Sequence, residues 1–153
     1  MIKVLLIVGI LTTSVCVGVV INNYFSMRVK IYKSIISIIQ AVKSEIQFLK
    51  TDKISLLKNQ DAANSLVKEF IDDYISLGEG NITCLKPNEN SEINRLFDSI
   101  GKSDVNGEIN NLQYYESLIL KNYHDSEDKF VKYGSFSIKM AILFGALIVI
   151  ILI

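Results

Sequence analysis

The chain has few of the residue types that build most catalytic and metal sites. Its 153 residues include two cysteines, one histidine, one proline and no tryptophan. Cys16 falls in an apolar segment and Cys84 in a polar one, so no disulfide framework or cysteine metal cluster is expected. His124 has no second histidine or cysteine at metal-ligand spacing, and no second histidine is present to act as the base for a nucleophile. We therefore predict no catalytic residue, no metal, no cofactor and no enzyme activity.

The chain also lacks an excess of charge of either sign. Sixteen basic and 16 acidic residues give a formal net charge of +0. Nucleic-acid binding that depends on releasing counterions from phosphates needs a positive surface, so the composition argues against that class of protein. The segment Gly78-Glu79-Gly80 lacks the lysine and the following helix of a phosphate-binding loop, which argues against nucleotide binding there.

Uncharged apolar sequence is concentrated at the two ends of the chain. Residues 4–21 and 140–153 carry no charge. A helix needs about 20 residues, each rising about 1.5 Å, to cross a hydrocarbon layer of about 30 Å. The first segment is long enough to cross this layer when its polar flanking residues are included. The second is long enough if it begins near Tyr133, which requires the ammonium of Lys139 to extend to the membrane interface. Both segments are predicted to cross a membrane.

A cleaved secretory signal is the alternative interpretation of the N-terminal segment, because Lys3 precedes an apolar run. The run is longer than the roughly 7–15 residues of a signal core, and no small-x-small cleavage triplet follows it. A lipoprotein cysteine at Cys16 would need a small residue where Val15 stands. Two membrane anchors flanking one domain fit the sequence better.

Basic residues flank the apolar segments on their inner sides and predict the orientation. These residues are Arg28, Lys30 and Lys33 after the first segment, and Lys129, Lys132 and Lys139 in and before the second. Only Lys3 and the terminal amine lie on the opposite side, so the middle segment is expected in the cytoplasm and both termini outside. Some of these cations are also expected to contact membrane lipid headgroups. The predicted domains are a transmembrane helix over 1–25, a cytoplasmic helical domain over 26–132 and a transmembrane helix over 133–153.

The middle segment has helical periodicity throughout. Apolar residues spaced by three or four form one stripe at Ile31, Ile35, Ile38, Val42, Ile46 and Leu49, and another at Ile109, Leu112, Tyr115, Ile119, Tyr123 and Phe130. Because neither helix is apolar enough all round to be stable alone in water, the stripes should face each other in an antiparallel pair. The fold class is therefore predicted as all-α, a small antiparallel helical bundle between two transmembrane helices.

Shorter helices should close this bundle. One begins at Thr51 or Asp52, and a second, with its stripe at Leu66, Phe70, Ile71, Tyr74 and Ile75, ends at Gly78 in a left-handed turn. Residues 79–90 are predicted as a loop, followed by a short helix from near Ser91 to Gly101. Ser103 or Asp104 should then cap the long second helix, which is expected to continue into the second apolar segment.

Three groups of residues are candidate interaction sites. Glu69, Asp72 and Asp73 form an acidic helix face, which is either simply solvated or docks a partner's basic patch. Gly101, Lys102, Ser103 and Asp104 form a turn that is either a docking site or purely structural, the latter if Gly101 is left-handed and Asp104 caps the helix. Of the adjacent Tyr114 and Tyr115, one should lie in the core and the other be available to a partner.

Short stretches of the sequence carry a resemblance. Three stretches resemble stage III sporulation protein AB of endospore-forming bacteria. They are the run Ile100-Gly101-Lys102-Ser103-Asp104, the run Gly107-Glu108-Ile109-Asn110-Asn111-Leu112, and the terminal segment with Lys139-Met140 and Gly145. Ser44-Glu45-Ile46 and the Thr51 to Leu57 helix start are similar to another region of that family. Glu108 stands where the family commonly has glutamine, and Lys53 where proline is usual.

The resemblance implies a non-enzymatic role in forming endospores. That family is a component of the multiprotein channel joining mother cell and forespore, lies in the mother-cell membrane, and is similar to the cytoplasmic helical domains of type II secretion F-type proteins. By this analogy the partners are the other channel subunits and a cytoplasmic secretion-type ATPase, stage III sporulation protein AA. A membrane-remodelling or lysis-type small membrane protein is the alternative, in which the two spans are the active part.

Overall fold

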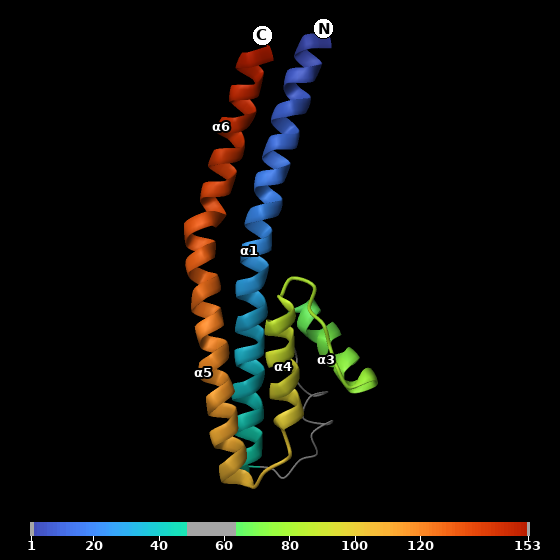
Figure 1. Ribbon diagram of the computed structural model, residues 1–153, viewed down its shortest axis with the longest axis vertical. Helices are drawn as coiled ribbons and strands as arrows, with labels where there is room; N and C mark the ends of the chain where they lie inside the picture. Colours follow the sequence, from blue (N-terminus) through green and yellow to red (C-terminus); the bar gives the residue numbers. More distant parts are fainter. Residues whose placement is uncertain (1, 49–63, 153) are drawn as a thin grey trace. The chain divides into compact units, whose positions relative to one another are not determined.

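The computed structural model describes residues 2–48 and 64–152, and the regular structure of these residues is helical throughout (Figure 1). In chain order the elements are α1 (Ile2–Phe48), α3 (Ser65–Leu77), α4 (Pro87–Ser99), α5 (Val105–Lys129), the π-helix η1 (Phe130–Gly134) and α6 (Ser135–Leu152). This confirms the predicted all-α class. The predicted helix start at Thr51 and the stripe position Leu49 lie outside the described residues.

The chain forms two compact units. One consists of Met1–Val29 together with Asp125–Ile153, and the other is Lys30–His124. Two helical stretches are long and apolar enough to cross a membrane by length and composition, within Leu5–Ile46 and Val105–Ile151. Both termini belong to the first unit, which we call the terminal unit. The second is called the helical unit.

In the terminal unit, the start of α1 and α6 run antiparallel (Figure 1). Small residues bring the two helices into contact. A Cβ placed on Gly18 would lie 3.0 Å from the Cβ of Ala141, and one on Gly145 would lie 3.0 Å from the Cβ of Ser14. The Ser14 hydroxyl donates a hydrogen bond to the backbone carbonyl of Ala141. Glycines on both helices therefore permit close approach, as small residues commonly do between membrane helices.

The helical unit has one hydrophobic core, built from all of its described helices. The predicted α1 stripe is confirmed, since Ile31, Ile35, Ile38 and Val42 are buried and Ile46 packs against the core. On α5, Leu112 and Ile119 are buried while Tyr115 and Tyr123 pack against the core. The remaining buried members are Tyr32, Ile39, Val67, Phe70, Ile71, Ile82, Leu85, Ile93, Leu96, Phe97 and Ile100. Burying each large aliphatic side chain contributes about 1.5–3 kcal/mol to folding.

Helix α3 begins and ends with side-chain and backbone caps. The Asn64 side chain accepts a hydrogen bond from the backbone N–H of Leu66 at 2.9 Å. Gly78 has φ of 85° and donates its N–H to the carbonyl of Tyr74 at 3.0 Å. The predicted left-handed stop at Gly78 is confirmed, and it depends on glycine because this φ disfavours other residues.

Helix α4 begins at Pro87, so the predicted loop 79–90 is wrong over its last four residues, 87–90. Proline is favoured at the first helical position because its missing N–H would have no partner there. The Glu89 carboxylate then accepts the backbone N–H of Lys86 at 2.7 Å, which satisfies a donor at the helix start. This proline, which the sequence pattern predicts as a loop residue, is the start signal of the helix.

The junction between α5 and α6 contains a π-helix that the sequence did not predict. The long helix continues into the second apolar segment as expected, but Phe130–Gly134 is η1. Gly134 is buried, and a Cβ there would lie 2.8 Å from Oδ1 of Asn22 and 3.0 Å from Cδ2 of Phe130. Such a π-segment adds one residue to a turn, and here the segment ends at the glycine that allows this close approach.

Candidate partner-docking surfaces

The turn from Gly101 to Asp104 has both features of a structural turn. Gly101 has φ of 82°, in the left-handed region. Asp104 caps α5, because its Oδ1 accepts the backbone N–H of Gly107 at 3.3 Å and its carbonyl accepts that of Glu108 at 2.8 Å. A Cβ on Gly107 would lie 2.7 Å from this same Oδ1, so glycine leaves room for the cap. Docking at this turn stays a prediction.

A buried carboxylate closes the turn from inside. Glu108 is only 3% exposed, and its Oε1 accepts the N–H of Gly101 at 2.6 Å while its Oε2 lies 3.4 Å from the N–H donor of Ser103. The sequence pattern does not indicate this role of Glu108, which depends on contact with a backbone N–H seven residues earlier. Because these backbone donors already have an acceptor, a partner at this turn would meet the exposed side chains of Lys102, Ser103 and Asp104.

The acidic face of α3 is divided between open surface and a cleft. Glu69 and Asp72 are exposed, whereas Asp73 is half-buried and lines the cleft beside α4. Within the described residues, no hydrogen bond or ion pair joins these three carboxylates to the Gly101–Asp104 turn. As the structure describes them, the sequence-predicted docking residues on α3 therefore have no direct polar contact with those before α5.

The cleft lies between the end of α3, the following loop and α4, and has a volume of about 1070 Å³. Both polar and apolar side chains form its walls. It is lined by Asp73, Leu77, Glu79, Gly80, Asn81, Thr83, Leu85, Pro87, Asn90, Ser91, Asn94, Arg95 and Asp98. Sequence periodicity did not indicate this cleft, because it forms only when the loop 79–86 folds back on α4.

Two asparagines of α4 hold that loop. The Asn94 side chain accepts the N–H of Gly80 and donates to its carbonyl, both at 2.9 Å. Asn90 does the same with Ile82, at 2.9 and 3.1 Å, and also donates to Oδ1 of Asn81 at 2.7 Å. Each asparagine thus satisfies a backbone donor and acceptor that a buried loop would otherwise leave unpaired. The loop wall of the cleft is fixed by these bonds.

An aromatic cluster supports the other wall. Phe70, Tyr74 and Phe97 have ring centroids 5.5–6.4 Å apart. The Tyr74 hydroxyl donates to Oδ1 of Asp98 at 2.7 Å. Burial and then this hydrogen bond to the neighbouring carboxylate raise the pKa of Tyr74, because both disfavour the phenolate. A Cβ on Gly80 would lie 2.6 Å from the Phe70 ring, so glycine allows the loop to pass against it.

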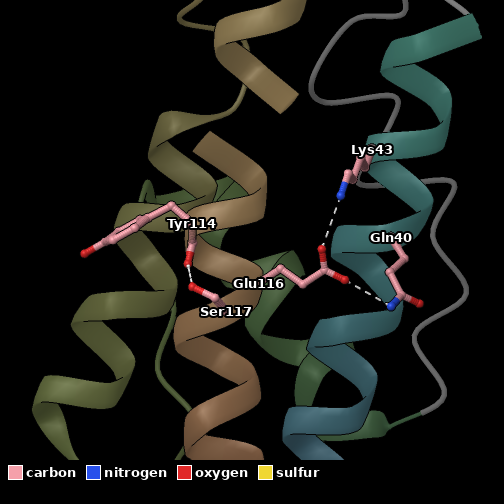
Figure 2. Close-up of polar contacts among 5 residues, drawn as sticks. All are labelled: Gln40, Lys43, Tyr114, Glu116 and Ser117. Carbon is pink, nitrogen blue, oxygen red and sulfur yellow. Dashed lines mark hydrogen bonds and ion pairs between the residues drawn. The ribbon is translucent and has the colours of Figure 1, made fainter. Parts of the chain in front are cut away.

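Beside the core stripe of α5, polar contacts tie α5 to α1. Glu116 accepts hydrogen bonds from Nε2 of Gln40 at 3.1 Å and Nζ of Lys43 at 3.4 Å (Figure 2). The side chains of Tyr114 and Glu116 point in opposite directions from α5 (Figure 2). Tyr114 is 62% exposed, whereas Tyr115 packs against the core, so the prediction of one core and one available tyrosine is confirmed.

These observations define the class of the protein. It is a small helical protein with two apolar helical segments able to cross a membrane, and a helical unit whose polar side chains mainly hold turns and loops together. Within residues 2–48 and 64–152, no group of three or more histidine, cysteine, aspartate or glutamate residues could hold a metal ion.

The chain belongs to the stage III sporulation protein AB family, whose model matches residues 58–153. The matched region includes α3, α4, α5, η1 and α6. This confirms the resemblance found in the short sequence motifs. No curated protein and no solved structure matches the chain.

Proposed function

We propose that this protein is a non-enzymatic, membrane-anchored component of the channel between mother cell and forespore, required for endospore formation. In this proposal the helical unit lies in the cytoplasm and links a secretion-type ATPase to the membrane subunits of the channel. The observation that carries the proposal is membership of the stage III sporulation protein AB family in a chain with two apolar helical segments. The family supports a role in sporulation, and the helices support the membrane location.

The exposed surface of the terminal unit supports anchoring in a membrane. Its exposed side chains are mostly large and apolar, and Leu5 and Ile151 are 77% and 75% exposed. Contiguous apolar surface of this kind is rare on soluble monomers because contact with water is unfavourable. Lipid would cover the same surface at no such cost.

The distribution of basic side chains supports the cytoplasmic orientation. Lys30, Lys33 and Lys129 are exposed, and the Lys132 ammonium lies 5.2 Å from the centroid of the Tyr133 ring. Arginine and lysine near the ends of membrane spans favour the cytoplasmic side. Arg28 is 7% exposed and engaged within the protein, so its contribution to lipid contact is expected to be smaller than that of the three lysines.

Genetic replacement tests the role in sporulation. The gene is deleted in an endospore-forming host that carries it, and the full chain is restored from a second locus. We expect the deletion to block formation of heat-resistant spores and the restored chain to recover them. Normal spore counts in the deletion strain would contradict the proposal. The recovered strain also provides the membranes for the topology experiment.

Cysteine labelling tests the orientation. Cys16→Ala and Cys84→Ala remove the native thiols, and Gln113→Cys places one on an exposed position of α5. A membrane-impermeant maleimide should label this thiol only after the cells are permeabilised. Labelling in intact cells to the same extent would place the helical unit outside and overturn the cytoplasmic assignment.

A further inference from the structure

The cleft beside α4 has a charge pattern that its structural role does not explain. Three carboxylates line it, those of Asp73, Glu79 and Asp98, and Arg95 is the one cation among its lining residues. We propose that this cleft, called here the acidic groove, binds a lysine- or arginine-bearing segment of a partner protein. The inference deepens the proposed function, on which it rests for the partner's cellular identity, by naming the surface that the partner contacts.

Two of the carboxylates are available for such a partner. Within the described part of the chain, the side chains of Asp73 and Glu79 make no hydrogen bond or ion pair, and Glu79 is exposed. Asp98 accepts one hydrogen bond from Tyr74 through Oδ1, which fixes its position and leaves its other oxygen able to accept. Carboxylates held in this way form charge-assisted hydrogen bonds with ammonium and guanidinium groups.

The same charges disfavour other classes of ligand. Phosphate-bearing ligands, such as nucleotides, nucleic acids and anionic lipid headgroups, would be repelled by an excess of carboxylates. The described residues also contain no cluster of ligands suited to a metal ion. A cationic polypeptide segment is the ligand whose charge complements the groove.

Apolar side chains at the groove give the segment a place to anchor. Leu77 is 76% exposed at the end of α3, and Leu85 and Pro87 also line the groove. A large exposed leucine beside unpaired carboxylates matches a segment that combines cations with an apolar side chain. Burying apolar surface at the centre while charges pair at the rim is the usual arrangement of a protein interface.

The groove is also preorganised. Asn90 and Asn94 hold the loop wall through backbone hydrogen bonds, and Gly80 packs directly against Phe70. A wall that is already ordered loses little conformational entropy when a ligand binds. The bonds that build the loop therefore also prepare the groove for a partner.

A binding assay with defined peptides tests the proposal. Full-length protein is placed in nanodiscs of phosphatidylcholine, a lipid without net charge. The probe is a short fluorescein-labelled peptide in which lysines flank leucines, and the control peptide has glutamate in place of lysine. We expect the lysine peptide to bind by fluorescence anisotropy, more weakly at higher salt, and the glutamate peptide not to bind.

Three variants locate the binding. The double variant D73K/E79K should weaken binding about tenfold or more, because each substitution replaces an attraction with a repulsion. The matched variant E69K/D72K makes the same change in charge on the open face of α3 and should alter binding by less than about threefold. Arg95→Gln removes the one lining cation and should strengthen binding, a gain that misfolding would not produce. Circular dichroism checks that each variant is folded.

The outcomes separate this inference from the proposed function. Equal loss of peptide binding in the two double variants would overturn the acidic groove as the site. Unchanged peptide affinity in Arg95→Gln would also overturn it. Absence of binding by the lysine peptide to the unchanged protein would also overturn it. These results do not depend on sporulation, whereas normal spores in the deletion strain would contradict the proposed function and leave the peptide result as it stands.

Discussion

The carboxylate of Glu108, in the first turn of α5, accepts the backbone N–H of Gly101 at 2.6 Å. The helix thereby closes the turn that precedes it, with an acceptor that is 3% exposed. This relationship joins the run around Gly101 to the run beginning at Gly107. One supplies the backbone donors, and the other supplies the side chain that satisfies them.

Removing this acceptor should destabilise the protein. We expect Glu108→Ala to lower the free energy of unfolding by about 1–3 kcal/mol, because buried backbone donors lose their partner. Glu108→Gln keeps an oxygen acceptor and should cost less. Urea unfolding of the full chain in a mild detergent, followed by circular dichroism, measures both. Glu69→Ala, on an exposed carboxylate, is the control and should change stability by less than about 0.5 kcal/mol.

Two substitutions at Asp104 separate capping from docking. Asp104→Ala removes the cap and should lower stability by about 1 kcal/mol, whereas Asp104→Asn keeps a capping oxygen and should leave stability nearly unchanged. Thermal melting provides the stability values. If the Asn variant keeps its melting temperature but loses binding to the sporulation ATPase, the charge at this turn serves docking. Equal melting losses in both variants would contradict the capping geometry.

Close packing in the terminal unit makes Gly18 far more sensitive to substitution than Gly9. A Cβ on Gly18 meets Ala141 and Ile138 at 3.0 Å, while one on Gly9 meets nothing within 4 Å. We expect Gly18→Leu to lower stability by about 1–3 kcal/mol through overpacking. Gly9→Leu should be neutral or slightly stabilising, because leucine favours helix more than glycine does.

Loss of helical circular dichroism on heating in detergent micelles compares the two glycine variants. The account requires Gly18→Leu to melt at a lower temperature than Gly9→Leu. Identical melting curves would mean that α1 and α6 do not pack through Gly18.

The raised pKa of Tyr74 predicts a stability contribution that disappears at alkaline pH. The folded protein holds the phenolic proton more tightly than the unfolded chain, whose tyrosine pKa is about 10. The contribution is therefore fully present below about pH 10 and is lost as pH rises toward the folded-state pKa. Below pH 10, Tyr74→Phe should cost about 1 kcal/mol, the worth of its hydrogen bond to Asp98.

Urea unfolding of both proteins at a series of pH values isolates this effect, because the other tyrosines titrate equally in each. The difference between wild type and Tyr74→Phe should shrink above about pH 10. A difference that stays constant or grows with pH would contradict a hydrogen bond donated by the phenol.

Local signals in the sequence were sufficient for most of the helices. The stripe containing Ile31 and Ile35 predicted a buried helix face, and Gly78 and Asp104 marked a helix end and a helix start that the structure confirms. These features depend on residues close together in the chain, where spacing and capping chemistry are informative. Pro87 is also a helix start signal, but the loop-forming residues around it favour a loop, so the sequence alone does not fix the start of α4.

The features that the sequence did not predict depend on contacts between distant residues. Asn94 bonds to Gly80, 14 positions earlier, and no periodic pattern indicates such a pairing. The π-helix ends at Gly134, which faces Asn22 on the opposite helix. The acidic groove likewise exists only once the loop is held on α4. Of the candidate site residues, the sequence identified Asp73 but could not show that it lines a cleft while Asp72 does not.

The most direct test of the proposed function is co-purification of the full chain with its ATPase. An affinity-tagged chain is solubilised from membranes of sporulating cells with a mild detergent, captured, and probed for stage III sporulation protein AA and the other channel subunits. An unrelated tagged membrane protein of the same cells is the control. The account predicts that the ATPase is enriched with the membrane subunits in the sample and not in the control. Recovery of the folded chain without the ATPase would contradict its proposed role as the link.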